Sequence, residues 1–135
     1  MILVILSIIG CVTFLCFHRV FCLSRPKIKA KVTSRYLDHL PKDGVLVEGL
    51  IAYSVAFQSY RRRIVVIPHE PDEKEAIAQT KLSIKEFDLH YVVFSDLWKT
   101  ELLAYPAINY IKTFSLIKII NEDKDRYYVY EIKNS

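Results

Sequence analysis

At 135 residues, the chain has room for one domain of ordinary size and one accessory segment. Residues 1–35 carry six basic side chains and no acidic ones, which leaves 13 basic and 15 acidic side chains in residues 36–135, a net charge of −2. That balance argues against a nucleic-acid-binding domain, which would present a basic face. The three cysteines, Cys11, Cys16 and Cys22, lie in or beside the first apolar segment. The rest of the chain therefore has no disulfide framework, thiolate metal site or cysteine nucleophile.

The first 17 residues contain no charged residue, proline, asparagine or glutamine. As a helix they would span roughly 25 Å, slightly less than a hydrocarbon core of about 30 Å, and the apolar run resumes at residues 20–23. A buried core helix normally keeps some polar periodicity, and a cleaved signal peptide normally begins with basic residues. Neither pattern is present, so residues 1–23 are expected to form an uncleaved transmembrane anchor.

Residues 24–40 are expected to form a basic stalk that ends in an amphipathic helix. Five basic side chains flank the apolar segment and suit contact with anionic headgroups: Arg19, Arg25, Lys27, Lys29 and Lys31. Pro26 breaks the first helix. Apolar side chains then recur at helical spacing over residues 29–40, on a stripe formed by Val32, Tyr36 or Leu37, and Leu40.

Residues 41–135 are expected to form one α/β domain, which opens with a turn over residues 41–44. Runs of β-branched and aromatic residues predict buried strands over residues 45–48 and 64–67 and within residues 89–98, where the third strand ends in Ser95 and Asp96. Helices are predicted between and after them, over residues 50–59, 72–87, 98–104 and 106–112. Asp72 and Glu75 have the spacing of a capping box at the start of the second of these helices.

The alternation of strands and helices indicates a mostly parallel sheet in a small three-layer arrangement. Right-handed crossovers would place the first strand between the second and the third. Two further strands, over residues 114–120 and 127–132, are joined by the polar residues 121–126 and are expected to add an antiparallel hairpin at the edge.

Polar residues follow the three predicted parallel strands at the edge where open α/β sheets bind ligands. Glu48, His69 and Asp96 could therefore converge on one cleft and ligate a divalent metal or relay a proton. The alternative is that loop tips at strand ends are polar because they meet water. The three glycines form no phosphate loop, so no cofactor is predicted. Arg61, Arg62 and Arg63 are expected at the opposite, amino ends of the strands.

Several motifs along the chain resemble one known family. They are LPKDGVLVEG at residues 40–49, RRIVVIP at 62–68, FDLHYVVFSDLW at 87–98, AYPAINYIKT at 104–113, and FSLIKII with YYVYEI in the final hairpin. Together they are similar to the C-terminal extramembrane domain of prokaryotic, especially archaeal, membrane glycosyltransferases related to the dolichyl-phosphate-mannose protein mannosyltransferases. In that family the active site lies in a many-helix membrane body, so its catalytic residues have no counterparts here.

The resemblance implies a non-catalytic, membrane-anchored interaction or accessory module, with membrane lipid and a multi-helix glycosyltransferase as its partners. The alternatives are a small membrane-tethered, metal-dependent enzyme or a ligand-binding sensor at the Glu48, His69 and Asp96 cleft. The basic stalk after the anchor favours a cytoplasmic domain by the positive-inside rule. The resemblance implies an extracytoplasmic domain, and this location is preferred because a basic stalk can contact headgroups on either face.

Overall fold

The computed structural model describes residues 30–60, 63–96 and 106–133. The expected anchor over 1–23, the first part of the stalk and the expected helix over 98–104 lie outside the described residues. Within the described ranges, no helix is long and apolar enough to cross a membrane.

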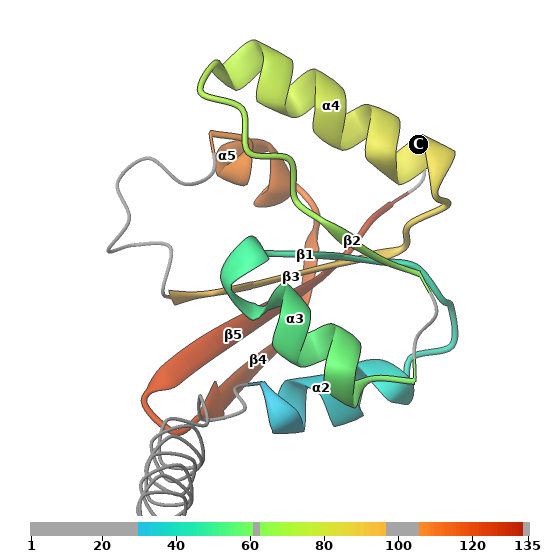
Figure 1. Cartoon of the computed structure of the whole chain (residues 1–135), viewed down its shortest axis with the longest axis vertical. Helices are drawn as coiled ribbons and strands as arrows, with labels where there is room; N and C mark the ends of the chain where they lie inside the picture. The colour runs from blue at the N-terminus through green and yellow to red at the C-terminus, as the bar shows by residue number, and fades with distance from the viewer. Residues whose placement is uncertain (1–29, 61–62, 97–105, 134–135) are drawn as a thin grey trace, which may run out of the picture.

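Five strands form one mixed sheet in the order β2-β1-β3-β5-β4 (Figure 1). The strands are β1 (Val45–Val47), β2 (Ile64–Val66), β3 (Tyr91–Ser95), β4 (Ser115–Glu122) and β5 (Asp125–Glu131). Strand β1 pairs in parallel with both β2 and β3, as the right-handed crossovers predict. The hairpin of β4 and β5 adds antiparallel pairs beyond β3. The described sheet is therefore evenly mixed, with two parallel and two antiparallel pairings, rather than mostly parallel.

Helices cover both faces of the sheet and complete three layers (Figure 1). On one face, α2 (Lys31–Asp38) and α3 (Gly49–Gln58) contribute to a core with Val45 and Val47. On the other, α5 (Ile108–Ile111) packs on Leu46, and Ile84 of α4 (Glu73–Glu86) lies against the same cluster. Strands β1 and β3 are buried along their whole length, which explains their unbroken apolar sequences.

Strand β2 differs from the fully buried strand that its sequence predicts. Its three residues lie at an edge of the sheet, where Ile64 and Val65 are half-buried and Val66 is 51% exposed. A strand with one neighbour and only partial cover keeps some of its side chains in solvent, and the apolar run alone does not reveal this.

The apolar stripe predicted for α2 is confirmed at Leu37, which is in the core, and at Leu40, which packs against it, but not at Val32. In α2, Val32 is 51% exposed, whereas Thr33, Ser34 and Leu37 are buried. In α4, Ala76 and Thr80 are the fully buried side chains, and Phe87, at the C-cap, is 44% exposed. The predicted N-cap of α4 is confirmed, because Asp72 Oδ1 accepts a 2.9 Å hydrogen bond from the Glu75 backbone N–H.

The predicted polar loop over residues 121–126 is wrong. Strand β4 continues to Glu122 and β5 begins at Asp125, so only Asp123 and Lys124 form the turn. Asp123 has a φ of 55°, a conformation that aspartate tolerates better than most residues. A two-residue turn of this kind allows polar residues to continue the pairing of the two strands.

Candidate functional site

Glu48 lies at the carboxyl end of β1 and at the N-cap of α3, where it is fully buried. Its Oε2 accepts hydrogen bonds from the backbone N–H of Ser95 at 2.6 Å and from the Ser95 hydroxyl at 2.8 Å. These bonds join the carboxyl ends of β1 and β3. The carboxylate predicted to face a cleft therefore lies inside the protein and holds two strands together.

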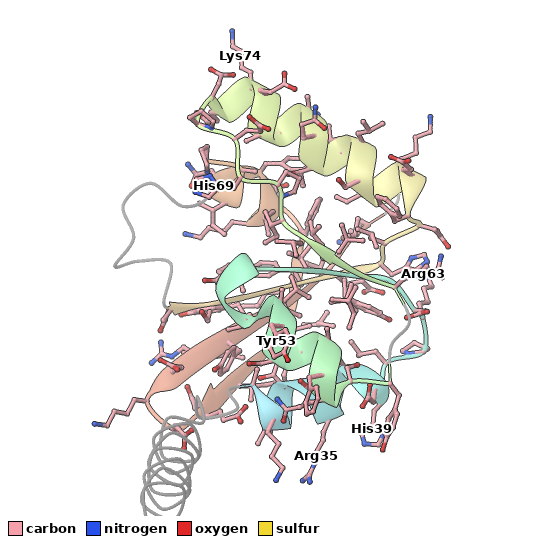
Figure 2. The ribbon with its side chains drawn as sticks, in the orientation of Figure 1. Arg35, His39, Tyr53, Arg63, His69 and Lys74 are labelled. Carbon is pink, nitrogen blue, oxygen red and sulfur yellow. The ribbon has the colours of Figure 1, made fainter. Side chains whose placement is uncertain are left out.

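The other two predicted cleft residues have different surroundings. His69 is exposed on the segment that leads from β2 to α4 (Figure 2). The side chain of Asp96 is 28% exposed, and its Oδ2 lies 4.0 Å from Arg126 Nε. No group of three histidine, cysteine, aspartate or glutamate residues in the described ranges is arranged to hold a metal ion. Glu48, His69 and Asp96, all of them described, do not form such a group.

A network of charged side chains lies at the opposite, amino ends of the parallel strands. Arg63 Nη1 lies 3.2 Å from Asp88 Oδ2, and Arg63 Nε lies 3.6 Å from Asp43 Oδ2. His90 Nε2 lies 3.3 Å from the second carboxylate oxygen of Asp88. The hydrogen bond from Arg63, with a smaller contribution from His90, lowers the pKa of Asp88 below its ordinary value. The position expected for the arginine triplet is confirmed for Arg63, while residues 61–62 lie outside the described ranges.

An open groove of about 690 Å³ lies where the C-terminal end of α4 approaches α5 and the end of β5. Its apolar lining comes from Ile84, Phe114 and Ile132, and its polar lining includes Tyr110, Lys85 and Lys133. Burial raises the pKa of the Tyr110 phenol. Lys81 Nζ lies 5.2 Å from the centre of the Tyr110 ring. This groove does not lie at the carboxyl ends of the parallel strands, where the sequence predicted a cleft, and no sequence motif indicates it.

Three aromatic side chains are exposed at the outer side and end of α3. Tyr53 is 80% exposed, Phe57 is 71% exposed and Tyr60, just after the helix, is 91% exposed. The rings of Tyr53 and Phe57 stack, with centroids 6.3 Å apart and an interplanar angle of 15°. The sequence of α3 is apolar on all sides, which is typical of a helix with no solvent-facing side. The sequence pattern therefore predicts the helix and does not show that Tyr53 and Phe57 are exposed.

Helix α2 packs beside α3 and carries exposed polar side chains at every fourth residue. These are Lys31, Arg35 and His39, of which Arg35 and His39 point away from the sheet in Figure 2. Asp38 joins the two helices, because its Oδ1 accepts hydrogen bonds from the Ser59 hydroxyl at 2.6 Å and from the Tyr60 backbone N–H at 2.9 Å. We refer to one set of exposed side chains as the aromatic–basic surface: Lys31, Arg35, His39, Tyr53, Phe57 and Tyr60.

The likeness to the tail domains of membrane glycosyltransferases depends on the sequence motifs and stays a prediction. No family model, curated protein or solved structure matches the chain.

Proposed function

We propose that the chain is a single-pass membrane protein whose α/β domain is a non-catalytic interaction or accessory module. Its partners would be membrane lipid and a multi-helix membrane glycosyltransferase that supplies the lipid-linked sugar chemistry. The uncharged run over residues 1–17 supports the anchor, and the motifs of the strands and hairpin support the link to glycosyltransferases.

The observation that carries the non-catalytic role is the burial of Glu48. A general base or metal ligand must reach its substrate or metal, directly or through one water. Glu48 is 0% exposed, and its Oε2 accepts two hydrogen bonds from Ser95. This carboxylate stabilises the junction of β1, β3 and α3, a role that explains the residue without any reaction.

The direct test is a sugar-transfer assay with the full chain. The purified protein in nanodiscs would be incubated with labelled polyprenyl-phosphate sugar donor and candidate acceptors, with Asp96→Asn as the matched variant. We expect no product above the blank for either protein. Product that forms with the natural chain and disappears with Asp96→Asn would overturn the non-catalytic role and favour the enzyme.

The soluble domain is proposed to lie outside the cytoplasm, as the family resemblance implies. Protease added to sealed, right-side-out vesicles would then digest the domain. Complete protection of the domain, with digestion restored when detergent opens the vesicles, would place it in the cytoplasm instead.

A second candidate function is the binding of a small ligand in the groove beside α5. The groove combines apolar and aromatic side chains with Lys85 and Lys133, while the lining carboxylate of Asp88 is engaged by Arg63. This composition suits a small anion with an apolar or aromatic part. Benzoate and indole-3-acetate would serve as probes in nuclear magnetic resonance titrations. Shifts of the Tyr110 and Phe114 ring signals would support this candidate, and unchanged signals would remove it.

A further inference from the structure

Three exposed aromatic side chains gather on and just after α3, as is typical of a surface that contacts another molecule or a membrane. Tyr53, Phe57 and Tyr60 are each more than two-thirds exposed and lie within eight consecutive residues, on or just after one helix. Isolated exposed apolar residues are common, whereas a gathered set normally marks a contact with another molecule or a membrane. Their chemistry and their neighbours indicate which contact this is.

We propose that the aromatic–basic surface rests on the anionic headgroups of the membrane that holds the anchor. This inference rests on the proposed membrane anchoring and adds the orientation of the domain on the bilayer. Tyrosine places an apolar ring in the acyl boundary while its hydroxyl stays in water, which is why it gathers at membrane interfaces. Phe57 adds a fully apolar ring beside Tyr53.

The exposed cations next to the aromatic rings are complementary to an anionic lipid surface, and the nearby Glu122 carboxylate accepts hydrogen bonds from the first N–H groups of α2. Lys31 and Arg35 are exposed on α2, which packs against α3. Asp38 lies in the same region, and its Oδ1 is engaged by Ser59 and Tyr60. Cations within a Debye length of an anionic leaflet are attracted to it. Helices that lie in this interface combine aromatic side chains with lysine and arginine, and here two adjacent helices supply them, the rings from α3 and the cations from α2.

The length of chain between the anchor and α2 keeps this surface close to the bilayer. Lys31 follows Leu23, the last residue of the expected anchor, by eight positions. Eight residues span at most about 28 Å when fully extended. The start of α2 therefore lies within about 28 Å of the headgroups, and α2, which packs against α3, is the first described helix after the stalk.

The two helices are held in a fixed relation, so the surface can act as one unit. Asp38 joins the C-terminal end of α2 to the residues that follow α3. The buried side chains Leu37, Ile51 and Val55 belong to the same core cluster. The aromatic rings and the basic side chains can then contact a flat bilayer together, without ordering a flexible segment at a cost in entropy.

Tryptophan fluorescence tests this contact in the full chain. In a Trp98→Phe background, Tyr53→Trp places the probe on α3, and Leu82→Trp places a matched probe on α4, where Leu82 is 54% exposed on the other face of the sheet. Both proteins would be reconstituted in vesicles of phosphatidylcholine and phosphatidylglycerol. Lipids brominated near the headgroup are expected to quench the α3 probe strongly and the α4 probe weakly or not at all.

A second measurement uses the unaltered chain and does not depend on the folding of a variant. A photoactivatable lipid with its reactive group at headgroup depth is expected to label the tryptic peptide over residues 43–61 in nanodiscs. The peptide over residues 82–85 of α4 provides the internal control. Replacing phosphatidylglycerol with phosphatidylcholine should reduce the labelling, because Lys31 and Arg35 then lose their anionic partners.

The outcomes distinguish this inference from the proposed function. If the chain enters nanodiscs but shows neither quenching at residue 53 nor labelling of residues 43–61, the result supports the anchor and overturns the proposed contact of the aromatic–basic surface with the membrane. A blue-shifted but unquenched probe at residue 53 would assign the surface to a protein, such as a second copy, and would also overturn the inference. A chain that does not associate with vesicles or nanodiscs at all would contradict the anchor itself.

Discussion

The Glu122 carboxylate accepts a 2.7 Å hydrogen bond from the backbone N–H of Lys31, a residue 91 positions earlier in the chain. Its other oxygen accepts from the backbone N–H of Val32 at 3.0 Å. The first N–H groups of a helix have no partner within the helix, and Ala30 at the N-cap has no side-chain oxygen to offer. Strand β4 therefore supplies the cap of α2 and fixes the start of the aromatic–basic surface.

Glu122→Ala is expected to destabilise the domain because this cap would be lost. Removal of a capping side chain typically costs about 1 kcal/mol, and up to about 2 kcal/mol in favourable sites. Urea unfolding of the full chain in detergent micelles would measure the change. Glu86→Ala, which removes an exposed carboxylate from the last turn of α4, is the matched control and should change stability by less than about 0.5 kcal/mol. Equal effects of the two substitutions would contradict the capping role.

Glu48→Ala is expected to be more damaging, since it leaves a cavity and removes the acceptor for the buried Ser95 N–H and hydroxyl. A loss of about 3 kcal/mol follows from the cavity and the unsatisfied donors together. Ser95→Ala removes only the hydroxyl bond and should cost about 1 kcal/mol. The same unfolding measurement gives both values. A Glu48→Ala protein as stable as the natural chain would show that the carboxylate has no structural role.

Gly44→Ala is expected to destabilise the turn before β1. Gly44 has a φ of 84°, and a Cβ at this position would come within 2.5 Å of the Asp88 carbonyl oxygen. A backbone atom cannot move aside as a flexible side chain would, so a cost of about 2 kcal/mol or more is expected. Gly49→Ala, at the exposed start of α3, is the control and should be neutral or slightly stabilising. A thermal midpoint of Gly44→Ala equal to that of the natural chain would contradict the assigned turn.

The stability of the domain should fall in alkaline solution because of Tyr127. Burial, together with the nearby carboxylates of Asp125 and Glu122, raises the pKa of Tyr127 to about 12. In the unfolded chain, Tyr127 ionises near the ordinary tyrosine pKa of 10, whereas in the folded chain it stays protonated up to about pH 12. As pH rises from 10 toward 12, ionisation therefore stabilises the unfolded state alone, and the free energy of unfolding falls. Urea midpoints measured across this range should decline less for Tyr127→Phe than for the natural chain. Parallel declines would assign the alkaline loss to other groups.

The sequence predicted the parts of the fold that depend on local patterns. The unbroken apolar runs of β1 and β3 predicted strands buried on both faces, and the handedness of crossovers predicted β1 between its two parallel neighbours. The polar residues around Asp123 did not reveal a two-residue turn, because their polarity is equally compatible with a loop or with exposed strand ends.

The candidate site was harder to predict because it depends on long-range contacts. Glu48 at a strand end is compatible with a cleft or with burial, and only the position of Ser95, 47 residues later, decides between them. The uniformly apolar sequence of α3 gives no preferred side, so the exposure of Tyr53 and Phe57 follows from how the helix packs. Likewise, nothing near Lys31 in the sequence indicates a cap from Glu122.

The central claim, that this domain is held at a membrane, is tested most directly by alkaline carbonate extraction of membranes from cells that produce the full chain. The natural chain is expected in the membrane pellet. The double variant Ile9→Arg/Val12→Arg is expected in the soluble fraction, because each arginine near the middle of the anchor costs about 2.5–3.5 kcal/mol on insertion. Recovery of the natural chain in the soluble fraction would contradict the claim.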